Sequence, residues 1–174
     1  NIENLKTSVL TRWGFPDVTF TKECRVFCVP SYSLLKKFFN INAARVQNRK
    51  DLNVIWLVLD DKPSKNILPL ITQVALNEYE ISQKTVLPFW FKRGAFVLSA
   101  SVADVRQELS NFYEIARKEQ FTHTAEQMLV GTEEEYNKQT AENKKIYDEQ
   151  ALCLCLLLRK EFGEVKLQGF LRIL

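Results

Sequence analysis

Two neighbouring carboxylates, Asp60 and Asp61, end the most apolar segment of the sequence, residues 52–59. Ligands of α/β proteins bind at the carboxyl ends of central strands, and paired carboxylates there suit Mg²⁺ and phosphoryl chemistry. Glu78 and Glu80 are further oxygen donors. An aspartate pair shortly before a proline is also ordinary turn chemistry, and the sequence has no glycine-rich phosphate loop. A metal-dependent hydrolase that uses Asp60 and Asp61 is therefore one alternative function.

The four cysteines and the single histidine do not have the spacing of a metal site or a catalytic triad. Cys24 and Cys28 share a face of a predicted strand, whereas Cys153 and Cys155 are about 200° apart around a predicted helix. No Cys-x-x-Cys pair is present, and no nucleophile motif accompanies His123. We therefore assign no catalytic residue, no metal ligand and no cofactor. Reduced thiols predict an intracellular protein of the nucleus or cytoplasm.

Basic side chains gather in two places beside aromatic rings. The segment from Ser31 to Lys50 contains no acidic residue, and Lys92 and Arg93 follow the aromatic run of residues 89–91. Cations that track phosphates and rings that stack on bases are typical of single-stranded nucleic-acid binding. The candidate basic residues are Lys36, Lys37, Arg45, Arg49, Lys50, Lys92 and Arg93.

The elements that position these residues are predicted from hydrophobic spacing and from turn signals. The nearly unbroken apolar run of residues 52–59 predicts a strand that is buried on both faces. Lys92-Arg93-Gly94 predicts a hairpin loop between two short strands, and the Thr132 capping box predicts a helix that ends at Gly163. The remaining predictions are helices over residues 2–13, 32–39, 64–80 and 101–119, and strands over residues 18–29, 85–91 and 95–99.

The order strand, helix, strand, strand, helix over residues 52–120 resembles an RNA recognition motif. Ile55-Trp56-Leu57 is similar to the first-strand signature of that family, and Ala95-Phe96-Val97 to the middle of its third-strand signature. The resemblance implies an α+β, ferredoxin-like sheet with helices on one face and helical extensions at both ends. It also implies that Trp56 and Phe96 are base-stacking rings. The alternative is that both are residues of the hydrophobic core.

Length and composition favour one globular domain. The 174 residues are 46% hydrophobic, and the formal net charge is +3. The only methionine is Met128 and the sequence begins with Asn1, so we expect a fragment of a larger protein. Within residues 1–174 we expect an N-terminal extension, the central core and a long C-terminal helix, over residues 1–51, 52–120 and 132–162.

The favoured function is a non-catalytic interaction or scaffold domain in a nucleic-acid-associated complex. Its expected partner is another protein, bound through the long C-terminal helix or through the face of the sheet. Direct binding of single-stranded RNA is the second alternative, and the hydrolase is the third. No membrane association is expected, because no segment is as long and apolar as a membrane-spanning helix.

Overall fold

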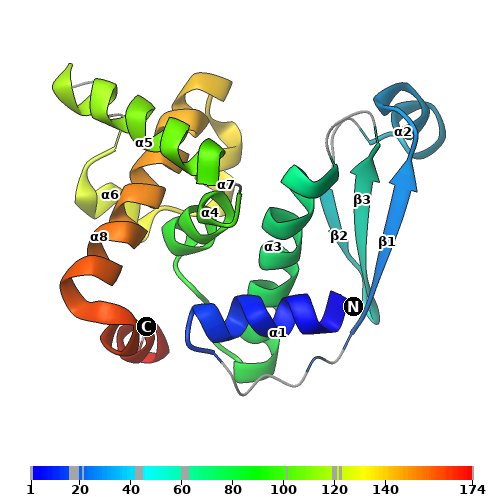
Figure 1. Cartoon of the computed structure of the whole chain (residues 1–174), viewed down its shortest axis with the longest axis horizontal. Coiled ribbons are helices and arrows are strands. Elements are labelled where there is room, and N and C mark those ends of the chain that lie inside the picture. Colours follow the sequence, from blue (N-terminus) through cyan, green and yellow to red (C-terminus); the bar gives the residue numbers. More distant parts are fainter. Residues whose placement is uncertain are drawn as a thin grey trace. The chain divides into compact units, whose positions relative to one another are not determined.

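The computed structural model describes residues 2–15, 20, 22–41, 45–59, 63–100, 102–118, 121 and 123–173. The chain is α+β, and it packs as two compact units, Asn1–Thr85 and Val86–Leu174 (Figure 1). The α+β expectation is confirmed. The boundary after Thr85 falls inside the core predicted for residues 52–120, whose two halves belong to different units. The expectation of one domain over residues 1–174 stays a prediction.

The first unit contains a small mixed sheet and three described helices. Strand β3 (Leu52–Val58) lies in the centre, parallel to β1 (Glu23–Val29) and antiparallel to β2 (Arg45–Asn48). The helices and strands predicted for this part of the sequence are confirmed, and β2 is an additional strand that was not predicted. The described helices are α1 (Ile2–Arg12), α2 (Tyr32–Phe39) and α3 (Pro63–Gln83).

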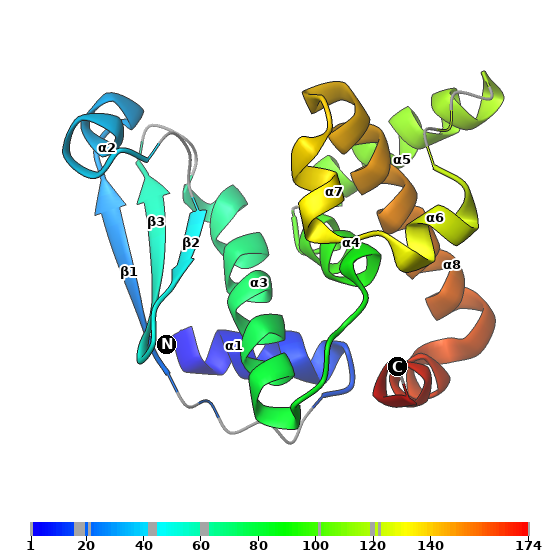
Figure 2. The same ribbon diagram turned by 180° about the vertical axis from the view of Figure 1, so that it is seen from behind.

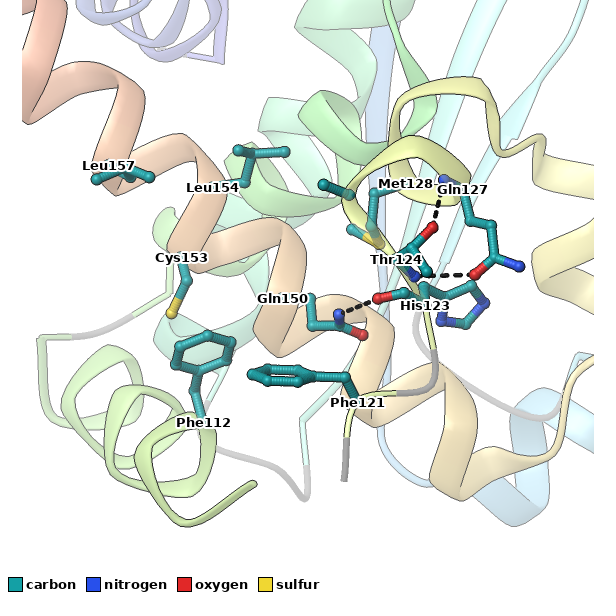
Figure 3. Close-up of a pocket in the computed structure, with 11 residues that line it drawn as sticks. Phe112, Phe121, His123, Thr124, Gln127, Met128, Gln150, Cys153, Leu154 and Leu157 are labelled. Atoms are coloured by element: carbon teal, nitrogen blue, oxygen red, sulfur yellow. Dashed lines mark hydrogen bonds between the residues drawn. The ribbon is translucent and has the colours of Figure 1, made fainter. Parts of the chain in front are cut away.

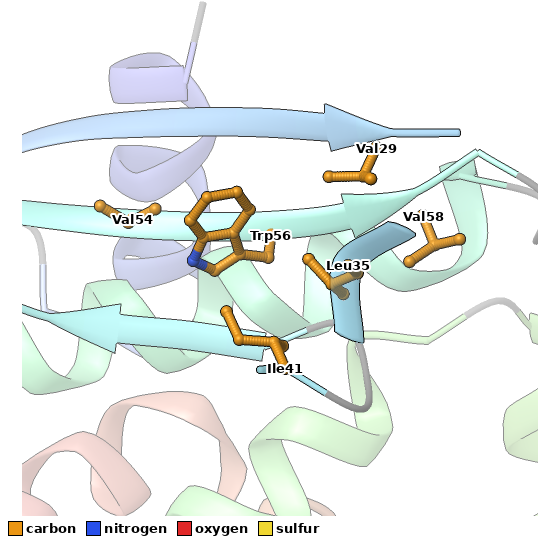
Figure 4. Packing of buried hydrophobic residues seen from close by; sticks show 6 residues of the cluster. All are labelled: Val29, Leu35, Ile41, Val54, Trp56 and Val58. Atoms are coloured by element: carbon orange, nitrogen blue, oxygen red, sulfur yellow. The ribbon is translucent and has the colours of Figure 1, made fainter. Parts of the chain in front are cut away.

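Strand β3 is buried on both faces, as its apolar sequence predicts. Side chains alternate along a strand, so one face carries Val54 and Trp56 and the other carries Asn53 and Ile55. Helix α3 packs against β3 on the Asn53 face, and helix α1 packs on α3. On the opposite face, Leu35 of α2 joins a hydrophobic cluster with Val54, Trp56 and neighbouring residues (Figure 4).

Helix α2 has defined ends that explain where it begins and stops. The hydroxyl oxygen of Ser31 accepts a hydrogen bond from the backbone N–H of Leu34, as the predicted N-cap requires. Asn40 adopts a left-handed conformation, with φ of 53°, and its N–H donates to the carbonyl of Lys36. This geometry ends the helix directly after Phe38 and Phe39, which remain exposed at its last turn.

The regular secondary structure described in the second unit consists of helices joined by short loops (Figure 2). Helix α4 (Phe89–Leu98) packs on α8 (Ala141–Ile173), and α5 (Val102–Arg117) also packs on α8. The unit also contains α6 (Ala125–Val130) and α7 (Glu133–Lys138). Among the described residues, no helix combines the length and apolar character needed to cross a membrane.

The predicted hairpin over residues 85–99 is wrong, because residues 89–98 form helix α4. The strand order that resembles an RNA recognition motif is therefore not formed in this segment. The aromatic and β-branched residues of this segment have a local preference for strands. Its buried side chains, however, recur with the period of a helix. The buried positions are Leu87, Trp90, Phe91, Gly94, Ala95 and Leu98, with spacings of three and four residues.

Gly94 is not a turn residue but a point of close helix contact. A Cβ atom at this position would lie 2.5 Å from the carbonyl oxygen of Ala151 and closer still to Sγ of Cys155. Helix α4 can approach α8 this closely because glycine has no side chain. The glycine that suggested a hairpin loop therefore allows two helices to pack closely.

The long helix predicted over residues 132–162 is divided. The Thr132–Glu135 capping box is confirmed, but α7 ends at Gln139, whose ψ of 160° is extended. Thr140 then begins α8, and its hydroxyl accepts from the N–H of Asn143. Gly163 has φ of 71° and kinks α8 where the predicted helix ends. A second cap inside the polar segment explains the break.

Candidate functional site

The structure divides the predicted nucleic-acid-binding residues between the two units. Those of the first unit are Trp56, Lys36, Lys37, Arg45, Arg49 and Lys50, and those of the second unit are Phe96, Lys92 and Arg93. The two rings that the family resemblance paired, Trp56 and Phe96, therefore belong to different packing units and to different kinds of element. The two groups have different surroundings.

Three residues form a row across the sheet of the first unit. Phe27 of β1 and Arg45 of β2 both pair with Trp56 of β3. Directly paired residues on neighbouring strands point to the same face, so an aromatic ring, an indole and a guanidinium lie side by side. The C-terminal turn of α2 adds Phe39 to this row, because its ring centroid lies 4.4 Å from that of Trp56.

Trp56 is the support of this row and not its exposed ring. Its exposed fraction is 7%, and its Nε1 donates to Oε1 of Gln47 at 3.0 Å. Phe27 stacks on it with centroids 5.1 Å apart and planes inclined by 26°. Phe27 and Phe39 are 44% and 49% exposed, and Phe38 is 65% exposed. The rings available to a ligand are thus the phenylalanines, which the sequence interpretation did not select.

Cations surround these rings. Lys36 and Lys37 lie in the last turn of α2 and are exposed, and Nζ of Lys37 lies 5.5 Å from the ring centroid of Phe38. Arg45 is exposed at the start of β2. We call the surface formed by these residues the aromatic–basic face. It consists of Phe27, Phe38, Phe39, Trp56, Lys36, Lys37 and Arg45.

The one carboxylate between residues 18 and 50 of the sequence is already paired. Glu23 accepts two hydrogen bonds of 2.9 Å from Arg25, and this pairing lowers the pKa of Glu23. Arg49 and Lys50 are exposed at the turn after β2, where Nζ of Lys22 donates to the carbonyl of Arg49. They extend the positive charge to the other end of β2.

The cation–aromatic cluster of the second unit is engaged within the protein. Nε of Arg93 donates to Asp148 at 2.8 Å, and the hydroxyl of Tyr136 donates to the same carboxylate at 3.1 Å. The guanidinium also lies over the ring of Phe96, with its Cζ 4.8 Å from the centroid. Burial raises the pKa of Tyr136 to about 12. Arg93 therefore joins α4 to Tyr136 of α7 and Asp148 of α8, a structural role.

A pocket of about 720 Å³ opens in the second unit between α5, α6 and α8 (Figure 3). Its walls are mainly apolar, and His123 lies at one end. Residues 151–158 of α8 are apolar without interruption. Ala151, Leu152 and Cys155 are buried, but Leu154 lines the pocket and Leu157 is half exposed at it. One side of this apolar part of α8 is not covered by the other described helices and forms a wall of the pocket.

The candidate metal and thiol chemistry finds little support in the described residues. Asp60 and Asp61 lie outside them, so the hydrolase alternative stays a prediction. Glu78 is buried and binds Lys6 and Asn53. In the part of the chain that the structure describes, no three His, Cys, Asp or Glu side chains are grouped to hold a metal ion. The four cysteines are free thiols.

Comparison with known proteins gave no relatives: no protein-family model, no curated protein and no solved structure matches this chain.

Proposed function

We propose that this chain is a binding module of a nucleic-acid-associated complex and that its aromatic–basic face binds single-stranded nucleic acid. The observation that carries the proposal is the exposure of three phenylalanine rings among cations on one side of the first unit. Rings stack on bases of any sequence, and cations attract the phosphates between them. A single strand offers unpaired bases to such rings, whereas the bases of a duplex are already stacked on one another.

The support beneath the rings favours stacking. Trp56 is held by its hydrogen bond to Gln47 and by the core cluster beneath it. Phe27 and Phe39 rest against its ring, so their orientation is set before a ligand arrives. A ring that is already ordered loses less conformational entropy on binding than a mobile one. Phe38, the most exposed of the three, projects beyond this platform at the end of α2.

Charge supports the same assignment. From residue 18 to residue 50, Glu23 is the only carboxylate in the sequence, and it pairs with Arg25. Asp17 and Asp51 lie directly outside this range. Lys36, Lys37 and Arg45 therefore have no acidic neighbour in that segment. A solvated face of a globular protein usually mixes both signs of charge.

The proposal is tested by fluorescence anisotropy of the whole chain with a labelled oligouridylate. We expect binding at low salt that weakens with added salt, with a slope of about −0.7 per neutralised phosphate. The same length of duplex should bind less well, and an oligothymidylate compares DNA with RNA. Absence of binding at low salt, where phosphate contacts are strongest, overturns the proposal.

Two matched pairs of variants locate the interface. Phe38→Ala should weaken binding about tenfold, because one stacked base contributes on the order of 1–3 kcal/mol. Tyr113→Ala, which removes a similarly exposed ring from α5, should leave affinity unchanged. Lys37→Glu should weaken binding and flatten the salt dependence, whereas Lys118→Glu in the second unit should not. Equal effects within either pair contradict the assignment to the aromatic–basic face.

A further inference from the structure

The pocket of the second unit is assembled from three separate parts of the chain. Phe112 comes from α5, and Cys153, Leu154 and Leu157 come from α8. The segment that contains α6 contributes Phe121, His123, Thr124, Ala125, Gln127 and Met128. Its volume of about 720 Å³ lies within the range of small-molecule sites, which is roughly 300–1,000 Å³. Walls on three sides give it the form of a ligand pocket.

Its chemical character changes from one end to the other. Figure 3 shows Phe112, Cys153 and Leu157 toward one end and the polar groups of His123, Thr124 and Gln127 toward the other. The described residues that line it include no Lys, Arg, Asp or Glu. Burial lowers the pKa of His123, although its hydrogen bond with Gln150 acts in the opposite direction. Its imidazole is therefore neutral near pH 7.

The polar end is held in place by hydrogen bonds. Nε2 of Gln150 donates to the carbonyl of His123 at 2.8 Å, which ties α8 to the segment before α6. Nε2 of Gln139 lies 2.9 Å from Nε2 of the His123 imidazole. Thr124 and Gln127 form a reciprocal capping box that begins α6. These contacts order the polar groups in the absence of a ligand.

We infer that this pocket binds an uncharged, largely apolar small molecule that carries one hydrogen-bonding group. The apolar body lies against Phe112, Leu154 and Leu157, and the polar group lies at the His123 end. An ionised ligand is disfavoured because no cation or carboxylate among the described lining residues compensates for the water it would lose. The inference concerns the second unit alone and does not depend on nucleic-acid binding by the first.

The thiol of Cys153 takes part as an apolar wall. Burial raises its pKa to about 12, so the reactive thiolate is scarce at neutral pH. Cys153 is therefore a poor nucleophile at neutral pH, and we expect a bound molecule to dissociate on dilution.

The experiment uses N-phenylnaphthylamine, an uncharged probe whose fluorescence rises in apolar surroundings. We expect saturable binding to the whole chain with one site. Decanol and decanoate then compete for that site, because they share a chain length and differ in charge. Decanol should displace the probe at concentrations about tenfold or more below those needed for decanoate.

Two leucines on the surface of the second unit provide a matched pair of variants. Leu157 lines the pocket and is 52% exposed, whereas Leu129 of α6 is 54% exposed and is not among the residues that line it. Leu157→Arg should weaken probe binding about tenfold and improve the relative competition by decanoate, because it brings a cation to the pocket. Leu129→Arg should behave like the unsubstituted chain.

Circular dichroism and thermal unfolding of both variants check that the fold is retained. Three results overturn the inference: probe fluorescence that does not saturate, equal effects of the two arginine substitutions, or decanoate that competes as well as decanol. If Leu157→Arg unfolds the chain, Leu157→Trp tests the same wall by filling space, and unchanged probe affinity then contradicts the site.

Discussion

The ammonium group of Lys6 lies 3.0 Å from Oε1 of Glu78, and both side chains are almost completely buried in the first unit. Oε1 of Glu78 also accepts a hydrogen bond of 2.7 Å from Nδ2 of Asn53, and Nζ of Lys6 reaches Glu3 at 2.9 Å. One buried ion pair thereby joins α1, α3 and β3. Because burial removes water from both charges, each partner depends on the other.

The substitution Lys6→Met should destabilise the first unit by roughly 3–5 kcal/mol, because it leaves the carboxylate of Glu78 buried without a counter-charge. Adding Glu78→Gln should restore part of this loss, since the amide is neutral and keeps an oxygen for Asn53. Urea unfolding measures both free energies. A double variant that is no more stable than Lys6→Met would show that the ion pair is not the cause.

Gly94→Ala should destabilise the second unit by about 1–3 kcal/mol, because the new methyl group overlaps the backbone of Ala151 and Sγ of Cys155. The steric cost exceeds the gain in helix propensity, which is about 1 kcal/mol. Gly169→Ala is the control, because nothing lies within 4 Å of its added Cβ. Thermal unfolding compares the two, and equal melting temperatures would contradict the close contact of α4 with α8.

Glu149 should make the stability of the second unit depend on pH. Burial and the neighbouring Glu108 raise its pKa from 4.5 to about 7, despite Lys145 nearby. Between these values the folded chain binds more protons than the unfolded chain. Stability is therefore greatest at the acidic side of this window and falls as the pH rises to about 7.

The substitution Glu149→Gln should remove this dependence and stabilise the second unit near pH 8 by roughly 1–3 kcal/mol. Glu142→Gln, an exposed position at the start of the same helix, should change little. Unfolding free energies measured from about pH 5 to pH 8 test both. If the unfolding free energy of Glu149→Gln still falls as the pH rises, another group causes the pH dependence.

Lys84 adopts a left-handed conformation, with φ of 51°, directly after α3. The N–H of Thr85 donates to the carbonyl of Glu80 at 3.1 Å, so the helix end requires this geometry. Lys84→Gly should stabilise the first unit by about 1 kcal/mol, because glycine adopts this conformation without steric cost. Lys84→Ala keeps the strain, and an equal gain from it in urea unfolding would contradict the explanation.

Much of the first unit follows from local patterns. An unbroken apolar run specified the doubly buried β3, and the Ser31 cap specified the start of α2. The basic residues between 36 and 50 were identified by their charge alone, because lysine and arginine remain exposed in almost any fold. Trp56 was located correctly in β3, and its burial agrees with the predicted burial of that strand on both faces. Phe27 and Phe39 cover it from positions 29 and 17 residues away in the sequence.

The second unit depended more on contacts between distant segments. Residues 89–98 have the composition of strands, yet helix α4 forms because its regularly spaced apolar side chains pack on α8. The binding pocket likewise needs α5, α6 and α8 together, and no local motif marks it.

By itself, the sequence determined the α+β class, the buried central strand, the helix caps and the basic character of residues 36–50. Tertiary structure decided which aromatic rings reach solvent, that Arg93 binds Asp148, and that His123 faces a pocket. The reason is physical. Charge, capping and periodicity act within a few residues, whereas exposure depends on which distant segments exclude water from a side chain.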